Sequence, residues 1–293
     1  MAWHAVEAIE EAAKETRELL LPFNLGLWAK LTLLTILTGS GLSTLSAQFS
    51  MNTGQLTYLG GLVQQSVTNM NSLIIMVAGL TVFLSIIFLL VTSIAEFAFF
   101  KSLMKRESYI RKYFRENLWK GFSFAAYRVI TGVLTLALIL FVFLAFSFNP
   151  FVGVLMLLMA LLVFAVFTVF DLLVRDLVLV EMIEEQQGLI ESLKTTWREF
   201  RPQWKQIAVY VVVRVVLVAA VGVALATAAG FAAFILFVPA VLFLFLTQLS
   251  VIFLIPLILI AVIGFIVITV ISMPFQAYIY NYKIEMYRGL KEE

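Results

Sequence analysis

Three long stretches of the chain are mostly apolar and carry no charged side chain. They run over Leu31–Ala95, Val129–Phe170 and Val215–Tyr282, and they are 65, 42 and 68 residues long. The surface of a water-soluble fold needs charged residues every few positions, whereas a charge at the centre of a bilayer costs roughly 2.5–3.5 kcal/mol by insertion scales. The pattern therefore predicts an integral membrane protein built from α-helices.

The lengths of these uncharged stretches limit how often the chain can cross the bilayer. One crossing needs about 20 apolar residues, so the middle stretch has room for two. Asn149 and Pro150 lie at its centre and supply a tight turn. The other two stretches hold either two crossings with about 20 residues to spare or three crossings with none. All 20 lysines and arginines lie outside the three stretches, and basic residues mark the cytoplasmic side, so each stretch is expected to leave the cytoplasm and return to it.

This reasoning predicts an all-α fold, a polytopic membrane helix bundle with six transmembrane helices arranged as three hairpins. We expect a single membrane domain over residues 1–293, located in the cell membrane with both termini in the cytoplasm. The predicted spans are residues 25–46, 73–99, 121–147, 151–172, 206–228 and 250–278.

Two connections on the outer side differ in character. The first, residues 47–72, is uncharged and rich in Gln and Asn, and is expected to form an external loop or a short surface helix. The other, residues 230–248, is apolar, with Pro239 at its middle as a natural bend. We expect it to be a re-entrant or interfacial segment, because a seventh span here would place residues 283–293 outside.

An amphipathic stretch precedes each predicted hairpin, near residues 2–13, 103–118 and 189–200. Such helices are typical of the membrane interface, with the apolar face in the headgroup region. The expected anchors beside them are aromatic and basic residues: Trp3, Trp28, Lys30, Trp119, Lys120, Trp204 and Lys205. The recurrence of an amphipathic stretch with its anchor residues before each hairpin indicates three repeated units, 1–100, 101–185 and 186–293. Alternatively, similar anchors arise without duplication, because any span that enters from the cytoplasm needs them.

Four ionisable side chains lie inside the predicted spans at similar depths from the cytoplasmic side: Glu96, Arg128, Asp171 and Arg214. Buried charges in a membrane are normally paired, so we expect the two carboxylates to neutralise the two arginines across helices. One interpretation is a lipid-headgroup or solute site in which the arginines bind phosphate. The other is structural, with the charges holding helices together or the arginines reaching for the interface.

The amino-acid composition excludes several kinds of catalytic and metal site. The chain has no cysteine and a single histidine, which excludes thiol catalysis, thiolate metal sites and a His-based metal site within one chain. It has no phosphate-binding glycine loop and no serine elbow. We therefore expect no enzyme activity, no metal and no cofactor. A net charge of +2 gives no indication of a nucleic-acid partner.

Several anchor motifs resemble a known group of proteins. They are Trp3-His4-Ala5-Val6, Pro22-Phe23 with Trp28, and Gln203-Trp204-Lys205 followed by Tyr210 and Arg214. Together they resemble uncharacterised archaeal six-span membrane proteins, and more loosely the membrane domain that accompanies some glycerophosphodiester phosphodiesterases. The resemblance implies a fold and no activity, because the phosphodiesterase domain has no counterpart in this sequence.

Two functional classes remain from the sequence. The first is a non-enzymatic membrane protein that binds or organises lipid, or a partner, at the cytoplasmic leaflet. The second is a transporter or channel for a small uncharged solute, since the outer half offers no fixed charge to attract ions. Expected partners are membrane lipids, with a protein partner or further copies of the chain as additional candidates.

Overall fold

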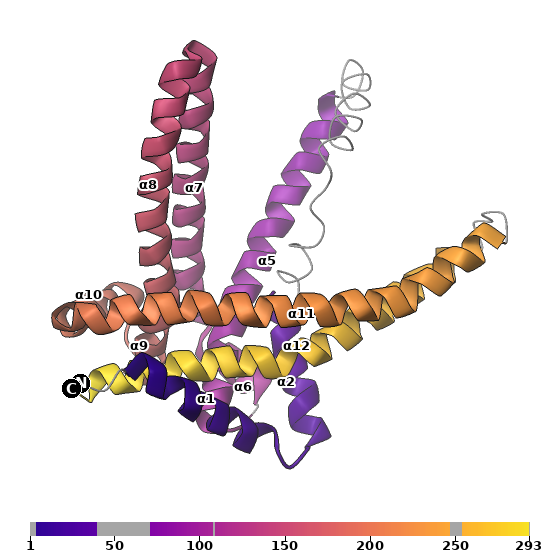
Figure 1. Cartoon of the computed structure of the whole chain (residues 1–293), viewed down its shortest axis with the longest axis horizontal. Helices are drawn as coiled ribbons and strands as arrows, with labels where there is room; N and C mark the ends of the chain where they lie inside the picture. Colours follow the sequence, from indigo (N-terminus) through magenta and orange to yellow (C-terminus); the bar gives the residue numbers. More distant parts are fainter. Residues whose placement is uncertain (1–3, 40–70, 108, 247–253, 293) are drawn as a thin grey trace.

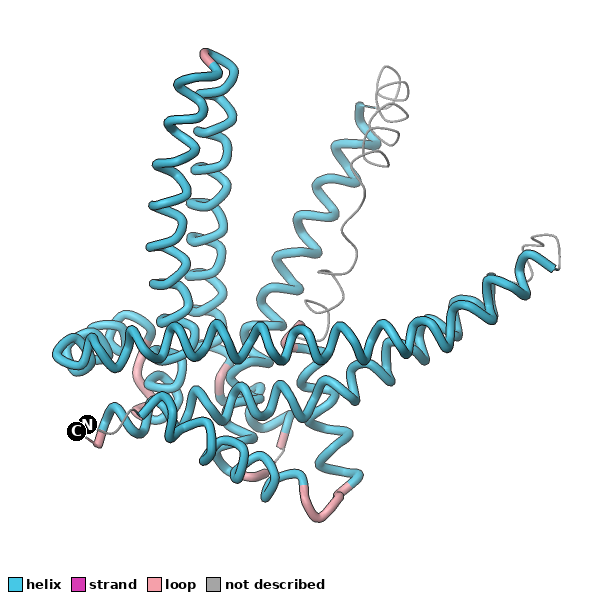
Figure 2. Tube along the Cα trace, viewed as in Figure 1, coloured by secondary structure: helices cyan, strands magenta, loops and turns pink. Residues whose placement is uncertain are grey.

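The computed structural model describes residues 4–39, 71–107, 109–246 and 254–292 (Figure 1). Within these ranges the chain is helical, with short loops and no strand (Figure 2). The end of the first predicted span, most of the outer connection 47–72, and Trp3 lie outside the described residues.

The elements follow one another along the chain in this order: α1 (His4–Leu20), α2 (Leu25–Leu37), α5 (Asn71–Lys105), α6 (Ile110–Glu116), α7 (Leu118–Phe148), α8 (Pro150–Leu173), the π-helix η1 (Val174–Val178), α9 (Leu179–Glu184), α10 (Leu189–Phe200), the 3-10 helix η2 (Arg201–Gln203), α11 (Trp204–Leu246) and α12 (Leu254–Lys291). Among the described residues, five helical segments are long and apolar enough to cross a membrane. They indicate a multi-pass membrane protein, since each exceeds the roughly 20 residues that one crossing needs.

The outer connection 230–248 is helical over most of its length. Pro239 was expected to bend the segment 230–248, which was expected to be re-entrant or interfacial; residues 230–246 continue α11, so Pro239 does not end the helix, and residues 247–248 lie outside the described part of the chain. A proline is tolerated inside a membrane helix when neighbouring groups satisfy the freed carbonyl, so an apolar run need not end there. With 43 residues, α11 is about 64 Å long at 1.5 Å per residue, about twice the hydrocarbon thickness.

The buried core lies at one end of the molecule, which we call the base. It contains α1, α6, η1, α9 and α10, together with the parts of α5, α7, α11 and α12 nearest to them. Large aromatic residues fill it, among them Phe97, Phe99, Phe100, Phe124, Tyr210 and Tyr282. From the base the α7–α8 hairpin, α5 and the α11–α12 pair extend in different directions, as three arms (Figure 1).

The termini meet at the base (Figure 1). Ala5, Ala8 and Ala12 on α1 are buried, and α1 packs along the last turns of α12. The hydroxyl of Tyr282 donates to the carbonyl of Ala5 at 3.2 Å. The side of α1 formed by Ala5, Ala8 and Ala12 is thus covered by protein, whereas Val6 is 53% exposed and can still lie in the headgroup region expected from the sequence.

The second amphipathic stretch, residues 103–118, is not one helix. Helix α5 continues to Lys105, a turn follows in which Arg106 has a φ of 53°, and α6 begins at Ile110. Tyr113 is the buried residue of α6. The break turns α6 back over the end of α5, which brings its basic residues to the outside of the base.

A glycine sets how closely α5 and α7 cross. A Cβ added at Gly121 would lie 2.9 Å from the Cα of Ile94, so only glycine fits at this point of α7. Two helical turns farther along α7, Arg128 lies beside Glu96 of α5. The close crossing therefore positions the first pair of charges that the sequence singled out.

Candidate functional site

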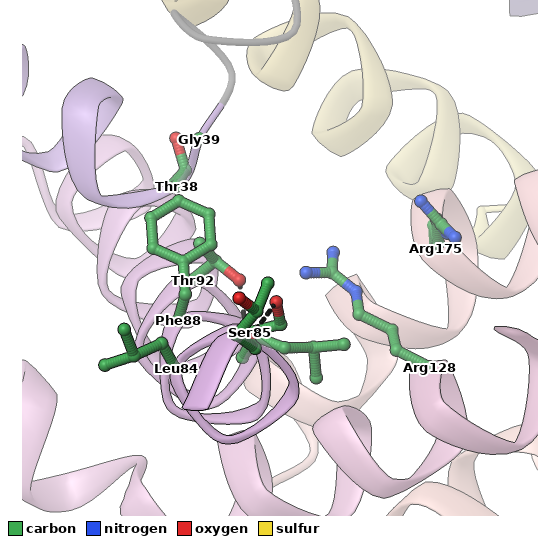
Figure 3. Close-up of a pocket in the computed structure, with 10 residues that line it drawn as sticks. Thr38, Gly39, Leu84, Ser85, Phe88, Thr92, Arg128 and Arg175 are labelled. Carbon is green, nitrogen blue, oxygen red and sulfur yellow. Dashed lines mark hydrogen bonds between the residues drawn. The ribbon is translucent and has the colours of Figure 1, made fainter. Parts of the chain in front are cut away.

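A wide, open cleft of about 760 Å³ lies where the α5 arm and the α7–α8 arm leave the base. Figure 3 shows Arg128 pointing across it toward Ser85 and Thr92 of α5, with Arg175 on the same side as Arg128. We call this space the base cleft. Its remaining lining is mostly from α2 and α5: Thr38, Gly39, Thr81, Leu84, Phe88 and Leu89.

The α5 wall of the base cleft follows from helical spacing. Thr81, Ser85 and Thr92 recur at intervals of four and seven residues, which places their hydroxyl groups on one face of the helix. The Ser85 hydroxyl donates to the carbonyl of Thr81 at 2.8 Å, and Thr92 donates to Leu89 at 3.0 Å. Because a hydroxyl can rotate, each group can turn from its own helix toward a ligand.

Arg128 is paired as the sequence predicts. Its Nη2 group forms an ion pair with Oε2 of Glu96, and its Nη1 group lies 3.4 Å from the hydroxyl of Ser93. The guanidinium also lies over the ring of Phe124, 4.8 Å from its centroid. An arginine has five N–H donors, so these contacts leave donors for a ligand in the base cleft.

The partner predicted for Asp171 is wrong. Oδ2 of Asp171 forms an ion pair with Nε of Arg175 at 2.8 Å. Its Oδ1 accepts a hydrogen bond from the Tyr127 hydroxyl at 3.0 Å. Arg175 lies one helical turn beyond Asp171, and residues four apart share a helix face, so the local partner is available without any helix crossing. The pair holds Arg175 at the edge of the base cleft.

Arg214 lies outside the base cleft and pairs with a residue that the sequence analysis did not consider. Its Nε lies 2.9 Å from Oδ2 of Asp176, whose other oxygen is 2.6 Å from Nζ of Lys283. The hydroxyl of Tyr210 also donates to Asp176, at 2.7 Å. Asp176 is 2% exposed, so a single buried carboxylate holds two cations from different helices.

The π-helix η1 explains why Asp176 was missed. Counted along the sequence, Asp176 belongs to the charged stretch that follows the fourth predicted span, next to Arg175. The wider turn of η1 changes the register there, and π-helical turns often occur at functional sites. The sequence offers one indication that Asp176 is buried: four apolar residues, Leu177–Val180, follow it directly.

The charged layer as a whole is positive. It contains three carboxylates, Glu96, Asp171 and Asp176, and four cations, Arg128, Arg175, Arg214 and Lys283. The one positive charge in excess belongs to the group of Asp176, Arg214 and Lys283, outside the base cleft, whereas Arg128 and Arg175 are each paired with one carboxylate. An anionic group beside the layer would offset the excess charge, because an uncompensated charge in a low-dielectric environment is costly.

The predicted anchor residues differ in their contacts and in how exposed they are. Trp28 donates from Nε1 to the carbonyl of Leu20 at 3.3 Å, and Lys120 donates to the carbonyl of Met182 at 2.8 Å. Trp119 and Trp204 are 83% and 63% exposed, and Lys205 lies over the Trp204 ring. Lys30 is exposed on α2. Trp119 and Trp204 thus remain exposed, whereas Trp28 links α2 to α1 and Lys120 links α7 to α9.

No group of three or more His, Cys, Asp and Glu residues that could hold a metal ion occurs among the residues placed by the structure. A protein-family model matches residues 3–293, and its description is a family of unknown function (DUF7544). Comparisons with curated proteins and with solved structures gave no match.

Proposed function

Because the chain belongs to the DUF7544 family, whose description names no activity, we propose a function from the geometry of the base cleft. The protein is a non-enzymatic membrane protein that holds the anionic headgroup of a lipid between Arg128, Arg175 and the α5 wall. The observation that carries this proposal is the pair of guanidinium groups along one side of an open cleft.

The chemistry of the base cleft supports an anionic ligand. Arginine presents a planar set of donors that matches a phosphate group with two parallel hydrogen bonds. The opposite wall combines the Phe88 ring and leucines with hydroxyl groups, which suits the boundary between lipid tails and headgroup.

The distribution of charge supports an orientation. All lysines and arginines of the chain lie outside the three uncharged stretches. Basic residues favour the cytoplasmic side, so we place the base, both termini and the base cleft at the cytoplasmic leaflet of the cell membrane. The arms then extend into the hydrocarbon.

The experiment measures how much lipid remains bound after purification in a mild detergent. We expect about one anionic phospholipid per chain by native mass spectrometry, and a several-fold loss in Arg175→Gln. The second variant combines Arg128→Gln with Glu96→Gln, which removes both members of a buried pair and avoids an unpaired carboxylate. Arg17→Gln, on the exposed face of α1, is the matched control.

Unchanged retention of anionic lipid in both base-cleft variants would reject the proposal. Loss of retention in Arg17→Gln to the same degree would reject it as well, because the effect would then come from net charge alone. Circular dichroism and elution volume in size-exclusion chromatography establish that each variant is folded.

Transport of a small uncharged solute is the second candidate. One observation favours it: Thr81, Ser85 and Thr92 form a line of hydroxyl groups along α5 that starts at Arg128 and leads away from the base. The test is the swelling of protein-containing vesicles in glycerol or urea. Swelling that Ser85→Leu abolishes would favour transport, and rates equal to protein-free vesicles would exclude it for these solutes.

A further inference from the structure

A second cavity lies on the outside of the base, between α2 and α6, and differs from the base cleft in residues and in charge. It has a volume of about 680 Å³, within the range of ordinary ligand sites. We call it the basic cavity. Lys30 of α2 lines it together with residues along α6 and the residue before that helix: Tyr109, Ile110, Arg111, Lys112, Arg115 and Glu116.

The basic cavity has four cations and one carboxylate. That carboxylate, Glu116, already accepts a hydrogen bond from Nζ of Lys101 at 2.6 Å, and Lys112 reaches it only at 4.0 Å. Within the described part of the chain, the structure gives no ion pair to Lys30, Arg111 or Arg115. Three positive charges are therefore left without a counter-charge.

Some other exposed basic residues of the base are neutralised by a carboxylate. Arg106 lies 2.7 Å from Glu15 and 3.1 Å from Glu18, and Arg288 lies 2.7 Å from Glu285. Acidic residues are thus available along the same surface, but none is placed in the basic cavity except Glu116. What distinguishes Lys30, Arg111 and Arg115 is that they line one cavity together.

The fold holds these cations together in spite of their repulsion. Arg111 and Arg115 are four residues apart on one helix face, an arrangement that destabilises a helix when the charges are alike. Tyr113, on the other face, is 2% exposed and lies under Nζ of Lys101, 5.4 Å from its ring centroid. The buried tyrosine fixes the rotation of α6, so its basic face cannot turn away from Lys30.

We propose that the basic cavity binds a group with two or more clustered phosphates, either on a lipid headgroup or free in solution. A single phosphate would leave positive charge unmatched, whereas a bisphosphate or diphosphate matches the excess. Arginine forks and lysine point charges are the usual ligands of such groups. Basic clusters next to an apolar membrane segment commonly bind polyanionic lipids, and Lys30 directly precedes the uncharged stretch that begins at Leu31.

The site is independent of the proposed function, because none of its residues lines the base cleft. Loss of lipid retention in the base-cleft variants therefore leaves this inference untouched, and the reverse also holds.

The experiment uses the full chain in two settings. In detergent micelles, inorganic pyrophosphate is titrated by calorimetry at low and at high salt. In nanodiscs of phosphatidylcholine with a small fraction of phosphatidylinositol bisphosphate, native mass spectrometry measures which lipid stays on the protein. The test variants are Lys30→Gln and the double variant Arg111→Gln with Arg115→Gln. The control removes the same charge from another exposed segment, through Arg198→Gln with Arg201→Gln.

We expect at least a tenfold loss of polyphosphate binding in the double variant and a smaller loss in Lys30→Gln, with the control unchanged. Binding of pyrophosphate in micelles identifies a soluble ligand as a sufficient source. Selective retention of the bisphosphate lipid without pyrophosphate binding identifies the headgroup. Absence of both, or equal losses in the control pair, overturns the proposal.

Discussion

Helix α7 passes through two environments, and its side chains differ accordingly. Near its start Phe124 and Ala125 are buried against α5 and the core of the base. Farther along, Leu140 and Phe141 are 53% and 56% exposed, although they are equally apolar. The arm therefore depends on lipid as its solvent, whereas the base depends on packing and paired charges. Substitutions of the same kind should have different effects in the two regions.

The largest effect should come from the buried carboxylate of the base. Asp176→Asn leaves Arg214 and Lys283 without their counter-charge, and breaking a buried pair in this way costs about 3–5 kcal/mol. The measurement is the free energy of unfolding in mixed micelles. Asp171→Asn is the control, because its partner Arg175 is half exposed and should be solvated after the change. Equal losses in the two variants would contradict the distinction.

Truncation of a leucine tests the contrast directly. Leu177 is 1% exposed in the base, so Leu177→Ala should lower the free energy of unfolding by about 2–5 kcal/mol. Leu140→Ala removes the same atoms from the lipid-facing side of the α7–α8 arm and should change it far less. If the arm variant is destabilised as strongly, then the arm packs against another helix in the membrane.

Two glycines of α7 test how closely the helices approach. Gly121→Leu drives a side chain into Ile94 and should cost about 1–3 kcal/mol, the usual range for overpacking. A Cβ at Gly132 meets nothing within 4 Å, so Gly132→Leu should be neutral or slightly stabilising, because leucine favours helix more than glycine does. Retained lipid should also fall in Gly121→Leu, since the crossing positions Arg128.

The smallest effect concerns a surface contact at the rim of the base. The hydrogen bond from Lys101 lowers the pKa of Glu116. A lowered pKa in the folded state means that the contact stabilises above the ordinary carboxyl pKa of about 4.3 and is lost as the pH falls through the folded value. The unfolding midpoint of Glu116→Gln should therefore lie slightly below the wild-type midpoint at pH 7 and approach it in acid. A difference that persists in acid would contradict this assignment.

The sequence was informative wherever one physical rule dominated. Absence of charge identified the apolar helices, and the pairing rule for buried charges predicted that Glu96 and Arg128 each pair across helices, which they do with one another. Asn149 ends α7 and caps α8, where its side chain accepts from the amide of Phe151 at 2.8 Å. Each of these features depends on residues that are close in sequence or on a single strong energy term.

The remaining features depend on three-dimensional register. The π-helical turn at η1 determines that Asp176, and not Asp171, meets Arg214. The convergence of Lys30 with Arg111 and Arg115 requires knowing how α6 folds back over α5. Periodicity along one helix carries no information about either arrangement, so the sequence analysis could not find them.

The packing of α1 on α12 sets an order of events during synthesis. Helix α1 leaves the ribosome before every other described element, and its partner is the last of them. Until α12 arrives, the alanine face of α1 has no protein surface to cover it. An amphipathic helix in that situation rests on the membrane surface. The contact between α1 and α12 therefore forms only after translation has reached the end of α12.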